Sequence, residues 1–163
     1  MQNESDKGED ARPQSGKKPE LGIVRRGADT RAGESALARE FAERALAPII
    51  GDLRARGGWL EPRRVAAAVG MRLDQLAGCL ELPEEELQRS PPPEHLEARL
   101  EPFAMVIGIV RDVFGGDDSR VRTWLRTARP ELDDQSPLDA MCVPSGIDRV
   151  IHFVLSAWLG NAD

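Results

Sequence analysis

Few side chains in this sequence have the type and spacing that catalysis or metal binding requires. The candidates are two histidines, two cysteines and two pairs of adjacent aspartates: His95, His152, Cys79, Cys142, Asp117-Asp118 and Asp133-Asp134. An active site needs convergent nucleophiles, acids or ligands. The chain has no HExxH, CxxC or GxSxG motif and no glycine-rich phosphate loop. The sequence therefore predicts a protein that is not an enzyme and uses no metal or cofactor.

The same residues have simpler structural interpretations. Both aspartate pairs stand in expected loops or helix starts, where carboxylates accept hydrogen bonds from free backbone amides. His152 lies off the main apolar stripe of the last predicted helix, so we expect it to face solvent or a partner. Cys79 and Cys142 are far apart and lack metal-ligand spacing. We expect both cysteines to be free thiols that pack as small apolar side chains in a reduced, cytoplasmic protein.

Composition favours an all-α protein. The chain has 163 residues, enough for one ordinary domain, or for two small ones and a tail. Aromatic residues make up only 4% and tyrosine is absent, so the core must be aliphatic, which favours helices over strands. The net charge of −6 argues against a nucleic-acid footprint over the whole chain but permits a local basic patch. No stretch is long and apolar enough for a membrane span, so we expect a soluble, cytoplasmic protein.

Patterning divides the chain into three parts. Residues 1–33 are polar and rich in glycine, proline and charge, which predicts a disordered tail. Residues 34–92 form a helical unit, and residues 93–163 form a C-terminal domain. Apolar residues at helical spacing, in two adjacent stripes of which one is Leu37, Phe41, Ala45 and Ile49, predict a helix with a broad apolar face that Pro48 kinks or splits and Gly57-Gly58 ends. This helix has a partner, either the core of its own domain or a second copy of the chain.

Residues 73–89 have the pattern of a helix-turn-helix unit. Two short predicted helices flank the turn Glu81-Leu82-Pro83, and the spacing of Leu76, Ala77, Leu82 and Leu87 resembles the Xre-type, phage-repressor-like version. Its second helix begins with Glu84-Glu85-Glu86, three carboxylates that would oppose DNA phosphates. Four arginines could offset them by contacting DNA: Arg63, Arg64, Arg72 and Arg89. The pattern is compatible with two roles for this unit: a structural or dimerisation role, and DNA binding.

A rigid corner is predicted in the C-terminal part. A long apolar helix runs from about residue 96 to 113, with Pro102 bending it or marking its start, and Gly115-Gly116 ends it. A short helix with Trp124 and Leu125 follows. After a proline-containing loop, Ser136 at the N-cap, Pro137 at the first helical position and Asp139 start another helix. A last amphipathic helix extends from about residue 145 to Gly160.

These C-terminal residues resemble the signature of the toxin-binding domain of Xre/MbcA/ParS antitoxins. The matching residues are Trp124, Leu125, Arg126, Thr127, Pro130, Leu132, Ser136, Pro137, Leu138 and Asp139. With the long helix and the Xre-like unit, the resemblance covers roughly Trp59 to Gly160. The sequence departs from the usual pattern at Ala128-Arg129-Pro130, at Met141, and at Asp133-Asp134, where the family tends to have glycine.

The resemblance implies an antitoxin of a type II toxin–antitoxin system. Such a protein binds and occludes the active site of a RES-domain toxin that acts on NAD or ADP-ribose, as a homodimer within a larger complex, and it can also repress its own operon by binding operator DNA. Carried onto this chain, the interface lies on the last helix and tail: Arg149, His152, Phe153, Ser156, Trp158, Gly160, Asn161 and Asp163. Spacing alone also permits Trp158 to be a core residue. The alternative function is a stand-alone Xre-like transcriptional regulator whose C-terminal domain oligomerises.

Overall fold

A computed structural model of the chain describes residues 27–160. The chain divides into two units, residues 1–37 and 38–163. The described part of the first unit, residues 27–37, is the beginning of helix α1 (Gly27–Leu46), so helix starts inside the segment 1–33 that was expected to be a disordered tail. The rest of that expected tail, residues 1–26, lies outside the described residues. The sections below concern the second unit.

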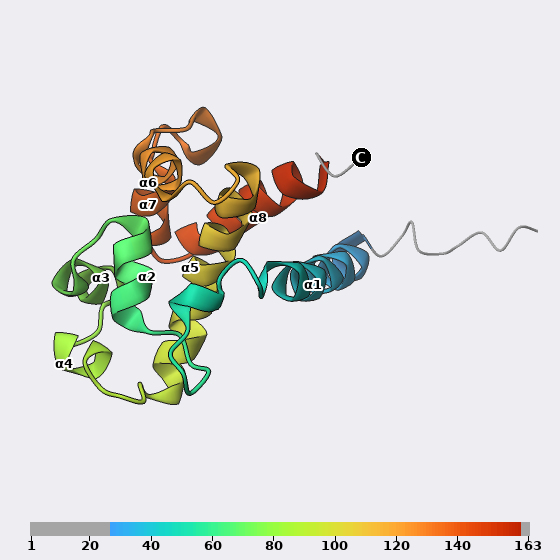
Figure 1. Cartoon of the computed structure of the whole chain (residues 1–163). Coiled ribbons are helices and arrows are strands. Elements are labelled where there is room, and N and C mark those ends of the chain that lie inside the picture. The colour runs from blue at the N-terminus through green and yellow to red at the C-terminus, as the bar shows by residue number, and fades with distance from the viewer. Residues whose placement is uncertain (1–26, 161–163) are drawn as a thin grey trace, which may run out of the picture. The chain divides into compact units, whose positions relative to one another are not determined.

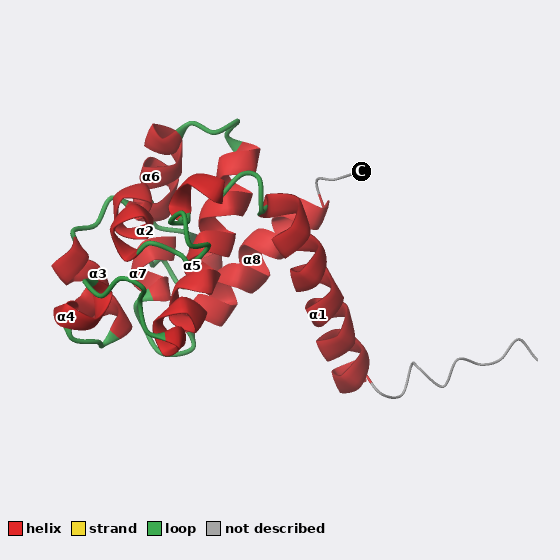
Figure 2. Ribbon diagram, turned by 60° about the horizontal axis from the view of Figure 1, so that its bottom comes forward, coloured by secondary structure: helices red, strands yellow, loops and turns green. Residues whose placement is uncertain are grey.

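The described residues fold into helices joined by short loops (Figures 1 and 2). After α1, the elements in chain order are η2 (Gly51–Leu53), α2 (Pro62–Val69), α3 (Leu73–Leu80), α4 (Glu84–Leu87), α5 (Glu94–Val113), α6 (Asp118–Arg126), η3 (Pro130–Leu132), α7 (Pro137–Met141) and α8 (Gly146–Gly160). Strand-like pairing within this range is limited to two isolated bridges. The predicted all-α fold class is confirmed. No helix of residues 27–160 is long and apolar enough to cross a membrane.

Helix α1 ends earlier than the sequence suggested. It stops at Leu46, two residues before Pro48, and a turn and η2 follow instead of a kinked helix that reaches Gly57. Proline lacks an amide donor and disfavours helical geometry in the preceding residue, so it ends this helix. Ala42 and Leu46 are buried in the core, whereas Phe41 remains 59% exposed. Only one of the two apolar stripes is thus used for packing.

Helix α5 is the centre of this unit and packs against α2, α6 and α8 (Figure 1). Every residue from Phe103 to Arg111 is buried, which agrees with the predicted central helix. Pro102 lies inside α5 and does not mark its start. Gly108 is needed for close packing, because a Cβ there would lie 3.0 Å from Cγ2 of Ile50 and 3.2 Å from Cβ of Leu46. An aliphatic core fills the unit, as the composition predicted.

The two cysteines form a disulfide bond, so the prediction of free thiols was wrong. Cys79 belongs to α3 and Cys142 is the C-cap of α7, and their sulfur atoms are 2.06 Å apart. The two cysteines are 63 positions apart in the sequence, so no local signal predicted the pairing, which depends on the packing of α3 beside α7. The cysteines therefore give no support to the expected cytoplasmic location.

The helix-turn-helix pattern corresponds to α3 and α4. Leu76, Ala77 and Leu87 are buried, so core packing accounts for their spacing. The second helix is only one turn long, from Glu84 to Leu87, where the sequence suggested a helix reaching Arg89. A recognition helix of this length would present mainly carboxylates to DNA.

Candidate partner-binding site

The capping residues that the sequence predicted for the start of α7 are present at the corner between α6 and α7. Oγ of Ser136 accepts a hydrogen bond from the backbone amide of Asp139 at 3.1 Å and donates one to Oδ2 of Asp139 at 2.7 Å. Pro137 occupies the first turn of α7. Asp117 caps the start of α6, because its side chain accepts hydrogen bonds from the backbone amides of Ser119 and Arg120. Local sequence therefore fixes where both helices begin.

The loop between these helices uses aspartates in a conformation that favours glycine. Asp133 and Asp134 have φ angles of 56° and 61°, at the positions where the resembling family tends to have glycine. Aspartate enters this left-handed region more readily than most residues. The carboxylate of Asp133 accepts a hydrogen bond from Arg149 at 2.7 Å, which links the loop to α8. Within residues 27–160, no group of histidine, cysteine and acidic residues is arranged to hold a metal ion.

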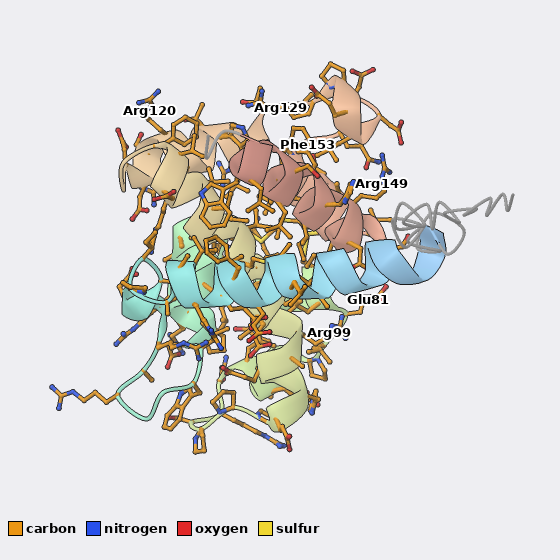
Figure 3. All side chains as sticks on the ribbon, turned by 90° about the vertical axis from the view of Figure 1, so that its right-hand side faces the viewer. Glu81, Arg99, Arg120, Arg129, Arg149 and Phe153 are labelled. Carbon is orange, nitrogen blue, oxygen red and sulfur yellow. A yellow bond between two sulfur atoms is a disulfide. The ribbon has the colours of Figure 1, made fainter. Side chains whose placement is uncertain are left out.

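Three stacked side chains join the corner to α8. The rings of Trp124 and Phe153 are nearly parallel, with 7° between their planes and 6.3 Å between their centroids. The guanidinium of Arg129 lies over the ring of Trp124, 5.2 Å from its centroid, in the geometry of a cation–π contact. Figure 3 shows Arg129 and Phe153 close to one another, with Arg149 further along α8. This column sets the position of α8 relative to α6.

Helix α8 separates a buried face from an exposed one. Val150, Ile151, Val154 and Leu155 are buried, whereas other positions face solvent. The exposed face and η3 together line a concavity of about 540 Å³, formed by Glu131, Leu132, Arg149, His152, Phe153, Ser156 and Ala157. Four residues that the sequence assigned to the interface thus meet at one surface: Arg149, His152, Phe153 and Ser156. Glu131, Leu132 and Ala157 were missed, because only the folded loop brings η3 beside α8.

Trp158 lies outside this concavity. It is half-buried, its indole nitrogen donates to Oδ2 of Asp112 at 2.8 Å, and its ring centroid is 6.1 Å from that of Phe41. Packing is therefore part of its role, as spacing alone allowed. Gly160 is exposed at the end of α8. Asn161 and Asp163, the other predicted interface residues, lie outside the described residues.

Two arginines of α6 have partners that the sequence did not suggest. Arg122 donates to the carbonyl oxygen of Ala67, and Arg126 donates to that of Gly70. These carbonyls belong to the C-terminal end of α2, where unpaired oxygens and the helix dipole attract cations. Both arginines remain exposed, so these hydrogen bonds form at the surface. The apolar motif residues Leu125, Leu132, Pro137 and Leu138 are buried, so they form a scaffold.

The four arginines suggested as DNA contacts differ in whether their side chains already bind other groups of the protein. Arg72 forms a salt bridge with Asp74 at 2.7 Å, and the hydrogen bond and charge of Asp74 raise the pKa of Arg72. Arg64 donates to the backbone oxygens of Asp52 and Arg54. Arg63 and Arg89 are exposed. With the short acidic α4, this arrangement favours a structural use of the helix-turn-helix pattern over DNA reading.

The elements around this surface match a known protein family. Residues 110–155 match the family described as the antitoxin Xre/MbcA/ParS C-terminal toxin-binding domain. Neither a curated protein nor a solved structure matches the chain. The matched region runs from the end of α5 through the stacked corner to most of α8. Residues 110–155 are therefore similar to the toxin-binding domain of the Xre/MbcA/ParS antitoxins.

Proposed function

We propose that this protein is an antitoxin that neutralises a RES-domain toxin acting on NAD or ADP-ribose. It binds the toxin with the exposed face of α8 and occludes the toxin's active site, and it catalyses no reaction itself. The observation that carries this proposal is the grouping of Arg149, His152, Phe153 and Ser156 in one concavity on the toxin-binding domain. The RES class of the toxin rests on the family resemblance.

The physical character of α8 supports a binding role. Its buried face holds the helix in the core. The helix backbone therefore does not have to be ordered when a partner binds the exposed face. Arg149, His152 and Ser156 recur at helical spacing, which suits a partner that lies along the helix. The salt bridge between Arg149 and Asp133 is 46% and 79% exposed at its two side chains, so it is weak and Arg149 can exchange it for a partner's carboxylate.

The exposed C-terminal end of α8 suits the proposed occlusion of the toxin's active site. Leu159 and Gly160, the last described residues, are exposed at its terminus. We propose that this end, including Asn161 and Asp163, approaches the toxin's nucleotide pocket. A homodimer within a hetero-oligomeric complex and a cytoplasmic location complete the proposal and follow from the resemblance.

The toxin class can be tested directly in cells. The cognate toxin is expressed from an inducible promoter with or without the full-length antitoxin, and cellular NAD and ADP-ribosylated protein are measured. We expect the toxin alone to deplete NAD or to modify protein, and we expect the antitoxin to abolish either effect. An antitoxin that restores growth while both measurements stay unchanged would show that the toxin has a different chemistry.

A further inference from the structure

A second apolar groove lies on the other side of Phe153. It is formed by the end of α5, Trp124 of α6 and the last turns of α8: Ile109, Val110, Val113, Phe114, Trp124, Phe153, Val154, Ala157 and Trp158. Its volume is about 140 Å³. Small-molecule pockets usually measure about 300–1,000 Å³. The groove is therefore suited to one apolar side chain of a macromolecule rather than to a cofactor or metabolite.

Two arginines stand over aromatic walls of this groove. Arg120 lies 4.7 Å from the centroid of Phe114, and Arg129 lies 5.2 Å from the centroid of Trp124. Neither arginine is within salt-bridge distance of a carboxylate among residues 36–160. Figure 3 shows both side chains at the same border of the molecule. Stacking on a ring restricts an arginine, so each cation is held in place before a partner arrives.

The acidic groups around the groove are already engaged. Asp112, at the Trp158 end, accepts the indole hydrogen bond of that residue. Asp117 caps α6, and Asp118 pairs with Arg111. The groove therefore combines an apolar floor with two fixed cations that lack an acidic partner in the described chain. Such a surface is complementary to a segment that carries both an apolar side chain and carboxylates.

We infer that this groove receives an amphipathic acidic segment of the toxin, which inserts one apolar side chain and places carboxylates against Arg120 and Arg129. The inference rests on the proposed antitoxin function and extends its interface beyond the exposed face of α8. Two observations favour the toxin as occupant. Phe153 lines both the groove and the α8 concavity, so the two surfaces are continuous, and most of the groove lies in the matched toxin-binding domain.

Charge reversal tests the inference. The affinity of the full-length antitoxin for its cognate toxin is measured by calorimetry at two salt concentrations, for the wild type and for a variant with Arg120→Glu and Arg129→Glu. The reversed variant should bind at least about tenfold more weakly, and its affinity should depend less on salt. Val113→Asp places a charge on a 60% exposed wall of the groove and should weaken binding to a similar degree.

A matched control carries the same change in charge elsewhere. Arg56 and Arg89 are exposed and lie outside residues 110–155, so Arg56→Glu with Arg89→Glu should bind within about twofold of the wild type. The milder pair Arg120→Gln and Arg129→Gln replaces the reversed variant if that variant does not fold. Equal toxin affinity for wild type, the arginine variants and Val113→Asp would overturn the inference. So would a change in the antitoxin's own oligomeric mass with unchanged toxin affinity, which would make a second copy the occupant. Absence of toxin binding by the wild type would instead contradict the proposed function.

Discussion

The ring of Trp124 lies parallel to the ring of Phe153, with 7° between their planes. One residue belongs to the short helix α6 and the other to α8, so this contact holds α8 against the corner. Arg129 covers the outer side of Trp124, and Arg149 binds Asp133 in the same loop. The corner thus acts on α8 through one aromatic contact and one ion pair.

Phe153→Leu should weaken toxin binding more than it weakens the fold. Leucine keeps apolar contact with the core but loses the parallel stack, and such stacks contribute about 0.5–1.5 kcal/mol beyond burial. We expect the free energy of unfolding to fall by about 1 kcal/mol, as measured by urea denaturation. The affinity for the toxin should fall further, since Phe153 lines both surfaces described above. An unchanged affinity would show that the ring only supports packing.

Removal of the disulfide should lower stability without unfolding the domain. Cys79 and Cys142 close a long loop between α3 and α7, and a cross-link of this kind contributes about 2–4 kcal/mol. Cys79→Ser with Cys142→Ser should therefore lower the free energy of unfolding by about that amount. A reducing agent should destabilise the wild type similarly and leave the double variant unaffected. Equal stability of the wild type with and without reductant would contradict the bond.

Arg111 is the main buried charge of the core. It is 6% exposed and binds Asp52 and Asp118. Burial acts to lower the pKa of Arg111, but the hydrogen bonds and charges of the two aspartates outweigh burial and leave the pKa raised. Arg111 therefore stays charged, and the stability that its raised pKa contributes is fully present below its unfolded pKa and is lost only as the pH rises through its folded pKa.

Loss of the two aspartates and loss of Arg111 should lower the stability of the protein by different amounts. Asp52→Asn with Asp118→Asn leaves the buried charge of Arg111 without an anionic partner, which typically costs about 3–5 kcal/mol. Arg111→Met should cost less, because the side chains of Asp52 and Asp118 are 62% and 43% exposed and can be solvated. Chemical denaturation of both variants measures the difference. The reverse order of stabilities would show that the aspartates are not the partners that Arg111 requires.

Gly146 should be essential for the position of α8. A Cβ at this first residue of the helix would lie 1.9 Å from the backbone oxygen of Ala140, so the helix would have to shift. We expect Gly146→Ala to lower stability by about 1–3 kcal/mol, the usual effect of overpacking, and to weaken toxin binding. Gly78→Ala is the matched control. It lies in α3 with open space around it, so alanine should raise stability by about 0.5–1 kcal/mol.

Sequence could predict the features that depend on local chemistry. Ser136 and Pro137 marked the start of α7, and the residues around Trp124 pointed to the family whose model matches residues 110–155. These signals act within one helical turn, or they reproduce a known pattern. The division of α8 into a buried and an exposed face also followed from its periodicity.

The missed features depend on contacts between distant segments. Cys79 meets Cys142 only because α3 packs beside α7, and Arg126 reaches Gly70 only because α6 packs beside α2. The concavity needs η3 beside α8, which no local pattern shows. The assignment of Trp158 to the toxin interface remains a prediction, and its hydrogen bond to Asp112 makes Trp158→Ala a poor test of binding, since the variant also loses packing.

Ser156 offers the most direct test of the central claim that the exposed face of α8 binds the toxin. It lies in the concavity, is exposed and makes no hydrogen bond through its side chain among the described residues, so Ser156→Arg should leave the fold intact. Inhibition of the purified toxin is measured with wild-type antitoxin, Ser156→Arg and the control Glu85→Arg, an exposed position of α4 outside the toxin-binding domain. The account predicts that Ser156→Arg requires at least about tenfold more protein for half-inhibition, while the control matches the wild type. Full inhibition by a folded Ser156→Arg variant at the wild-type concentration would contradict it.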